Sequence, residues 1–87
     1  MSDVLNDLEQ IIQERLSAAP EESYVASLQA AGLNKILEKV GEESFEVVLA
    51  ARDCETSENK TTVVKETADL LFHTLVMLAH LGLSHRD

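Results

Sequence analysis

Apolar residues recur at helical spacing along most of the chain, and proline and glycine separate the segments that carry this pattern. The first segment predicts a helix over about residues 2–18, which ends before Pro20 because a residue that precedes proline is disfavoured in the α conformation. A short second helix is predicted over about 23–31, with Gly32 as its C-terminal cap.

Two longer helices follow in the second half of the chain. Asn34 is predicted to cap a third helix over 35–53, and the polar stretch 54–59 lacks apolar periodicity and indicates a loop. A fourth helix is predicted from Thr61 or Thr62 to near Gly82. Since no segment shows the alternation of a strand, we expect an all-α fold.

The fourth predicted helix is apolar around almost its whole circumference, which is typical of a helix that is buried on several sides. At about 100° per residue, four polar side chains fall into the one narrow gap: Glu66, Asp69, His73 and His80. We therefore expect Glu66 and Asp69 to face the interior or a cleft. The two histidines are interpreted as hydrogen-bonded core or boundary residues.

The third predicted helix carries a second acidic group. Glu42, Glu43 and Glu46 lie three and four residues apart, so their side chains converge on one face. Like charges at this spacing cost about 0.2–0.5 kcal/mol per pair, and the cost rises if Glu66 and Asp69 lie beside them away from water.

A divalent cation would relieve this repulsion. Carboxylate ligands without a cysteine or histidine cluster favour Mg²⁺ or Mn²⁺ over zinc, and a di-iron site would need histidine where Asp69 follows Glu66. The spacing alone leaves a second interpretation open, in which the acids form a solvated face with salt bridges from Lys35 and Lys39.

Composition excludes several function classes. The 87 residues include 7 Lys and Arg against 16 Asp and Glu, for a net charge of −9, which argues against nucleic-acid binding. The chain length predicts one domain over 1–87. A single cysteine, Cys54, excludes a disulfide framework and a thiolate zinc site. With no signal-peptide or membrane-span pattern, we expect a cytoplasmic protein.

The acidic motif resembles that of the all-α nucleoside triphosphate pyrophosphohydrolases, the MazG-like superfamily. Its pattern is E-E-x-x-E followed by E-x-x-D, which this chain matches at 42–46 and 66–69. Within that group the chain is similar to phosphoribosyl-ATP pyrophosphatases, through the blocks PEESY at 20–24, KILEKVGEE at 35–43 and ADLLFH at 68–73. Ser44 and Phe72 stand where that family usually has alanine and tyrosine.

The resemblance implies an enzyme of histidine biosynthesis that cleaves 1-(5-phosphoribosyl)-ATP into phosphoribosyl-AMP and pyrophosphate. We then expect Mg²⁺, or Mn²⁺, at four carboxylates: Glu43, Glu46, Glu66 and Asp69. Glu42 would orient the attacking water, and with Glu43 and Glu46 it forms the predicted catalytic group. The predicted substrate-binding residues are Lys35, Lys39, Arg15 and Tyr24, with Lys65 a weaker candidate.

The fourth helix also bears on assembly. One chain of this length cannot cover a helix that is apolar on most sides, so we expect a helical bundle completed by dimerisation, as a homodimer or a dimer of dimers. Two other functions stay open: a housekeeping hydrolase of ordinary or damaged nucleoside triphosphates, and a helical oligomerisation module without activity. The second would leave the clustered carboxylates without a cation.

Overall fold

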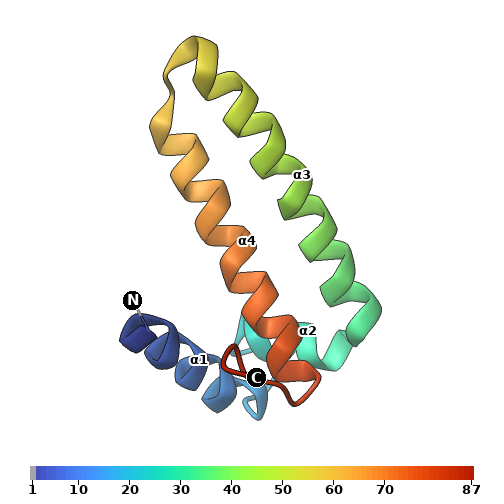
Figure 1. The fold of residues 1–87 in the computed structure, drawn as a ribbon. Helices are drawn as coiled ribbons and strands as arrows, with labels where there is room; N and C mark the ends of the chain where they lie inside the picture. The colour runs from blue at the N-terminus through green and yellow to red at the C-terminus, as the bar shows by residue number, and fades with distance from the viewer. Residues whose placement is uncertain (1) are drawn as a thin grey trace.

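A computed structural model describes residues 2–87, and these form four helices (Figure 1). The helices are α1 (Ser2–Leu16), α2 (Tyr24–Ala31), α3 (Leu33–Ser57) and α4 (Lys60–His80). No strand occurs in residues 2–87, which confirms the predicted all-α fold. The long helices α3 and α4 lie side by side and antiparallel, and α1 and α2 pack at the end where α4 finishes (Figure 1).

Capping residues fix both ends of α2, and the predicted C-terminal cap, Gly32, is confirmed. Ser23 has extended backbone angles, and its hydroxyl accepts a hydrogen bond from the Ala26 N–H at 3.2 Å. Gly32 ends the helix with a φ of 100°, a backbone conformation that residues other than glycine rarely adopt. The connector between α1 and α2 is fixed in this way, and it places Tyr24 at the first position of α2.

Both predicted bounds of α3 were wrong by a few residues. Gly32 turns the chain directly from α2 into α3, so α3 begins at Leu33 and Asn34 lies inside it. At the other end, the Ser57 hydroxyl donates to the Asp53 carbonyl oxygen at 2.8 Å, and the helix continues to Ser57 without apolar periodicity. The loop before α4 is therefore reduced to Glu58 and a capping asparagine.

The turn between α3 and α4 explains the start of α4 as well. Glu58 adopts a left-handed conformation with a φ of 60°, and its N–H donates to the Cys54 carbonyl oxygen. The side-chain oxygen of Asn59 accepts a hydrogen bond from the Thr62 N–H at 3.3 Å, so α4 begins at Lys60 and not at Thr61 or Thr62.

The hydrophobic core lies where all four helices meet, at the α1 and α2 end of the molecule. Its buried residues are Ile12, Val25, Leu28, Ile36, Leu75, Val76 and Ala79. The part of α3 and α4 that extends beyond α1 and α2 has no third helix against it (Figure 1). The fold thus anchors one end of the helix pair and leaves the other end in contact with solvent.

A buried carboxylate ties the C-terminal residues to α1. Glu9 is 8% exposed, and it accepts hydrogen bonds from the His85 backbone N–H at 2.9 Å and the Ser84 hydroxyl at 3.0 Å. Glu9 lies at helical spacing from Leu5 and Ile12, so the apolar stripe of α1 contains one acid. The hydrogen bond from His85 lowers the pKa of Glu9; burial opposes this, and Ser84, His85 and Arg86 support it.

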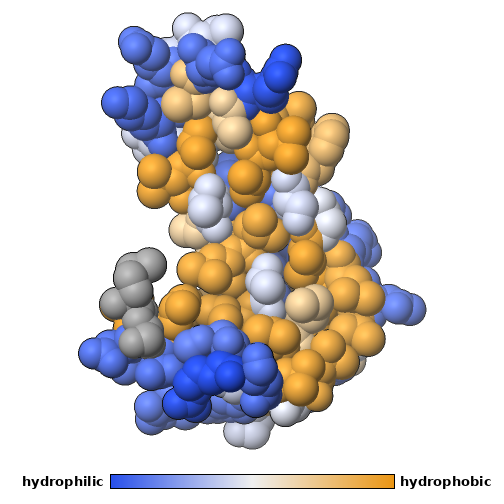
Figure 2. Space-filling model, viewed as in Figure 1, coloured by the Kyte–Doolittle hydropathy of each residue, from blue (hydrophilic) through white to orange (hydrophobic). Residues whose placement is uncertain are grey.

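Apolar side chains remain on the surface of the long helix pair. Phe45, Val48 and Leu49 on α3 are 53–62% exposed, and Val64 on α4 is 67% exposed. Figure 2 shows apolar surface over both helices on the face in view. No helix in residues 2–87 is long and apolar enough to cross a membrane.

Candidate metal and nucleotide site

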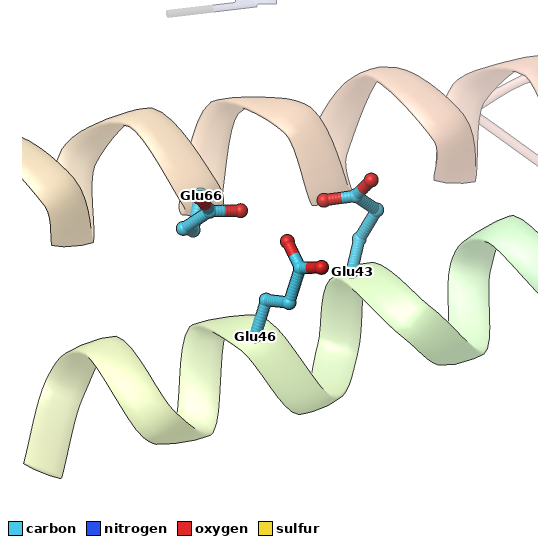
Figure 3. A group of neighbouring side chains, drawn as sticks. All are labelled: Glu43, Glu46 and Glu66. Atoms are coloured by element: carbon cyan, nitrogen blue, oxygen red, sulfur yellow. The ribbon is translucent and has the colours of Figure 1, made fainter.

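Three carboxylates from α3 and α4 meet midway along the helix pair. Glu43 and Glu46 reach from successive turns of α3 toward α4, and Glu66 reaches from α4 between the two helices (Figure 3). Each offers an oxygen that lies within 4.8 Å of the oxygens offered by the other two. The antiparallel pairing of α3 and α4 therefore brings together acids that are 20 or more residues apart in sequence.

Two oxygens of this group are buried without a hydrogen-bond partner in the described part of the chain: Glu43 Oε2 and Glu66 Oε2. The Glu43 side chain is 9% exposed and that of Glu66 is 15% exposed. An unpaired buried carboxylate oxygen is strongly destabilising. A divalent cation among the three carboxylates would satisfy both oxygens, and an all-oxygen donor set suits a hard cation.

The electrostatics of the three carboxylates also favour a bound cation. The pKa of Glu46 is raised, first because its protonated form can share a hydrogen with Glu66, and then because the negative charges of Glu66 and Glu43 oppose its ionisation. Burial raises it further, and Lys39 acts in the opposite direction. The three carboxylates repel one another, so a cation among them would be bound with a favourable electrostatic energy.

The other two predicted acids lie outside this group of three. Asp69 follows Glu66 by one turn, but its side chain is 42% exposed and pairs with Lys65 at 3.3 Å. Glu42 is exposed on α3 and pairs with Lys39 at 3.5 Å. The convergence expected for Glu42, Glu43 and Glu46 thus holds for Glu43 and Glu46, while the exposed Glu42 lies outside the group.

Of the predicted substrate-binding cations, Lys39 and the weaker candidate Lys65 lie beside the acids, with the Lys65 ammonium 3.8 Å from Glu66 Oε1. The Lys39 ammonium is 3.7 Å from Glu43 Oε1 and its side chain is 25% exposed. Burial lowers the pKa of Lys39, but the neighbouring Tyr24, Glu42 and Glu43 outweigh this and the pKa is raised. Lys39 therefore carries its positive charge firmly at the edge of the acidic group.

The remaining cations lie farther out. Lys35 is exposed one turn before Lys39 and pairs with Glu38 at 3.6 Å. Arg15 is exposed near the end of α1, a helix that contributes none of the three clustered carboxylates. Neither residue is brought to the acids by the fold of one chain.

Tyr24 is anchored by His73, interpreted from the sequence as a hydrogen-bonded core or boundary residue. The Tyr24 hydroxyl is 2.7 Å from His73 Nε2, and the buried His73 places Nδ1 2.8 Å from the Asp69 carbonyl oxygen, which confirms that interpretation. The Tyr24 ring also stacks on Phe72 at 6.1 Å. The polar gap of α4 contained His73, but no sequence signal identified its partner on α2.

A surface groove continues from the acids toward the α3–α4 turn. It has a volume of about 300 Å³ and is lined by Glu46, Leu49, Ala50, Asp53, Thr62 and Glu66. The groove is open to solvent, and it places a further carboxylate, Asp53, two turns beyond Glu46 on α3. Bulky ligands can therefore approach Glu46 and Glu66 from this side.

Comparison with known protein families shows to which family this chain belongs. The sequence profile of the family described as phosphoribosyl-ATP pyrophosphohydrolase matches residues 5–87, and so covers most of α1, the other three helices and the clustered carboxylates. This family comprises hydrolases of histidine biosynthesis that depend on a divalent metal ion, which agrees with the acidic group between α3 and α4. The chain belongs to the phosphoribosyl-ATP pyrophosphohydrolase family.

Proposed function

We propose that this chain hydrolyses 1-(5-phosphoribosyl)-ATP between its α and β phosphates, giving phosphoribosyl-AMP and pyrophosphate in the second step of histidine biosynthesis. The observation that carries the proposal is the pair of buried, unpartnered oxygens of Glu43 and Glu66 beside Glu46. An acidic protein needs such a place to hold a triphosphate, because its net charge of −9 repels the substrate.

Mg²⁺ is the cation we assign to this site, with Mn²⁺ as a substitute, because every available donor is a carboxylate oxygen. Glu43, Glu46 and Glu66 would hold the ion, and Asp69 would join them by releasing Lys65. When bound, the ion supplies charge neutralisation and polarisation of a phosphate oxygen.

The protein side chains would position the other reactants. Glu42 is exposed and pairs with Lys39 at the edge of the acidic group, and there it would orient a water molecule that enters from solvent. Lys39 lies close enough to Glu43 to bind phosphate oxygens at the edge of the site, whereas Lys35 and Arg15 would contact more distant phosphates. No covalent nucleophile is required, since positioning and electrostatic stabilisation account for most of the catalysis of phosphoryl transfer.

We further propose that two copies of the chain pair through the exposed apolar face of α3 and α4. This face includes Phe45, Val48 and Val64, each more than half exposed, at the end of the helix pair that lies away from the core. A two-fold pairing would bury these side chains against a second copy. The lone Cys54 fits a reducing compartment, so we assign the enzyme to the cytoplasm.

Removal and return of the metal test the reaction directly. The purified protein, treated with a chelator and dialysed, is expected to release no pyrophosphate from phosphoribosyl-ATP, and added Mg²⁺ should restore the release. The organic product should be phosphoribosyl-AMP, with no orthophosphate formed. Full activity after chelation, or release of orthophosphate, would contradict the proposed reaction.

A further inference from the structure

The two ring nitrogens of His73 have different partners, and these partners fix where its proton lies. Nδ1 is 2.8 Å from the Asp69 carbonyl oxygen, which can only accept, so Nδ1 carries the hydrogen. In a neutral imidazole the other nitrogen, Nε2, is then an acceptor. The Tyr24 hydroxyl, at 2.7 Å, must therefore donate its hydrogen to Nε2.

This assignment determines what Tyr24 offers to a ligand. Its only hydroxyl hydrogen is used by His73, so the phenol oxygen is left with lone pairs and acts as an acceptor. The side chain is 51% exposed, and its ring is held by stacking on Phe72 with an angle of 18° between the planes. A phenol in this state binds an O–H donor of a ligand and is unsuited to a phosphate oxygen, which also accepts.

The hydrogen bond to His73 places this acceptor near the acidic site. His73 lies one turn of α4 beyond Asp69, and its Nδ1 binds the Asp69 carbonyl oxygen at 2.8 Å, so the Tyr24 phenol is joined to α4 beside a proposed metal ligand. In a nucleotide, the O–H donors nearest to the α phosphate are the hydroxyls of the ribose attached to it. A nucleotide that binds its phosphates at the acids and extends along α4 toward His73 would bring a ribose hydroxyl to Tyr24.

We propose that His73 is a positioning residue that holds the Tyr24 phenol as an acceptor for a ribose hydroxyl of the substrate. This inference rests on the proposed function. His73 does not touch the substrate; it acts by keeping the Tyr24 hydrogen away from the ligand side and by fixing the phenol oxygen in place.

Kinetics with phosphoribosyl-ATP test this role. Tyr24→Phe and His73→Asn should each raise KM about 3- to 10-fold with little change in kcat, because one uniform binding interaction is lost. The double variant should be no worse than either single variant, since both changes remove the same hydrogen bond to the substrate. His73→Gln should keep a near-normal KM, because glutamine can place an amide oxygen near the position of Nε2.

A matched control separates positioning from a purely structural role. His80 also joins α4 to α2, through a hydrogen bond from its ring to Gln29, but it lies two turns beyond His73. His80→Leu should lower the melting temperature about as much as His73→Leu, and it should leave KM unchanged. An equal rise in KM for both variants, or a normal KM for His73→Asn, would overturn the inference.

Substrate analogues identify the donor. Phosphoribosyl-ATP analogues that lack the 2′ or the 3′ hydroxyl of the ATP ribose are compared in the wild type and in Tyr24→Phe. One of the two analogues should bind the wild type more weakly than phosphoribosyl-ATP does. The same analogue and phosphoribosyl-ATP should bind Tyr24→Phe equally well. If both analogues bind the wild type normally, the ribose assignment is wrong.

A spectroscopic measurement distinguishes failure of this inference from failure of the proposed function. The chain has one tyrosine and no tryptophan, so its tyrosine fluorescence reports Tyr24 alone. In the absence of substrate, His73→Asn should change this emission and His80→Leu should not. An unchanged emission would refute the positioning by His73 even if the enzyme is active, whereas a wild type that does not cleave phosphoribosyl-ATP would refute the proposed reaction.

Discussion

Glu43 on α3 and Glu66 on α4 each bury a carboxylate oxygen that has no hydrogen-bond partner within residues 2–87, and their ligand oxygens lie within 4.8 Å of each other. Two such buried oxygens on neighbouring helices are unfavourable in the absence of a cation. These acids lower the stability of the metal-free protein. A metal ion that binds them relieves this cost, and the relief contributes to the free energy of binding.

The first prediction concerns activity. Glu43→Gln, Glu46→Gln, Glu66→Gln and Asp69→Asn should each lower kcat/KM about 100-fold or more, because each removes a negative ligand from the proposed Mg²⁺ site. Circular dichroism should show that the helices remain. Glu38→Gln is the matched control, since Glu38 is an exposed acid on the same helix that pairs with Lys35. Full activity in any two of the four variants would refute the four-carboxylate site.

The second prediction concerns stability without metal. Glu43→Gln should raise the free energy of unfolding of the metal-free protein by on the order of 1 kcal/mol, because the repulsion of a buried carboxylate by Glu46 and Glu66 is removed. For a chain of this size that gain corresponds to a melting temperature about 4–8 °C higher. Added Mg²⁺ should then stabilise the wild type and have little effect on the variant. A variant that is less stable than the wild type without metal would contradict this, and would mean that the ion pair of Glu43 with Lys39 outweighs the repulsion.

The sequence predicted the acids better than it predicted their arrangement. The E-E-x-x-E and E-x-x-D patterns identified all three clustered residues, because helical spacing places Glu43 and Glu46 on one face. Spacing alone could not separate Glu43 from Glu42, since the choice depends on how α3 is rotated against α4. That rotation is set by packing of residues such as Ile36 and Val76 in the core.

Helix ends were predicted from the sequence only in part, and side-chain contacts between distant residues were not predicted. Gly32 was identifiable as a cap because capping residues act locally. The last turn of α3 was missed because it has no apolar pattern and is held by hydroxyl bonds to Asp53. The contact of Tyr24 with His73 spans 49 residues, and no local rule predicts it.

The third prediction concerns pH. The pKa of Glu9 is lowered in the folded protein from its ordinary value of 4.5, so its hydrogen bonds to Ser84 and His85 stabilise the fold fully above that value. This stabilisation should be lost as the pH falls below 4.5 through the lower folded value. Thermal unfolding of Glu9→Gln should therefore show a lower melting temperature than the wild type at pH 7 and a smaller difference near pH 3. Glu14→Gln, an exposed acid on the same helix, should show no such dependence. A difference in melting temperature between the wild type and Glu9→Gln that grows toward pH 3 would contradict the account.

The fourth prediction concerns assembly. Wild-type protein should sediment as a dimer or a dimer of dimers at micromolar concentration, and Phe45→Asp should weaken association about 10- to 100-fold by charging an apolar contact. Val4→Asp is the control, because Val4 is equally exposed but lies on α1. Leu75→Asp cannot serve here, since Leu75 is 3% exposed in the core and its replacement would unfold the chain. A folded, active wild-type monomer would contradict the proposed pairing.

The most direct test of the account is the choice of substrate. With Mg²⁺ present, pyrophosphate release is measured from phosphoribosyl-ATP and, under the same conditions, from ATP, dUTP and dCTP. The account predicts that kcat/KM for phosphoribosyl-ATP exceeds that for each plain nucleotide by about 100-fold or more, since only the former engages every proposed contact. Equal or faster hydrolysis of any plain nucleoside triphosphate would contradict the assignment to histidine biosynthesis and would favour a housekeeping pyrophosphohydrolase.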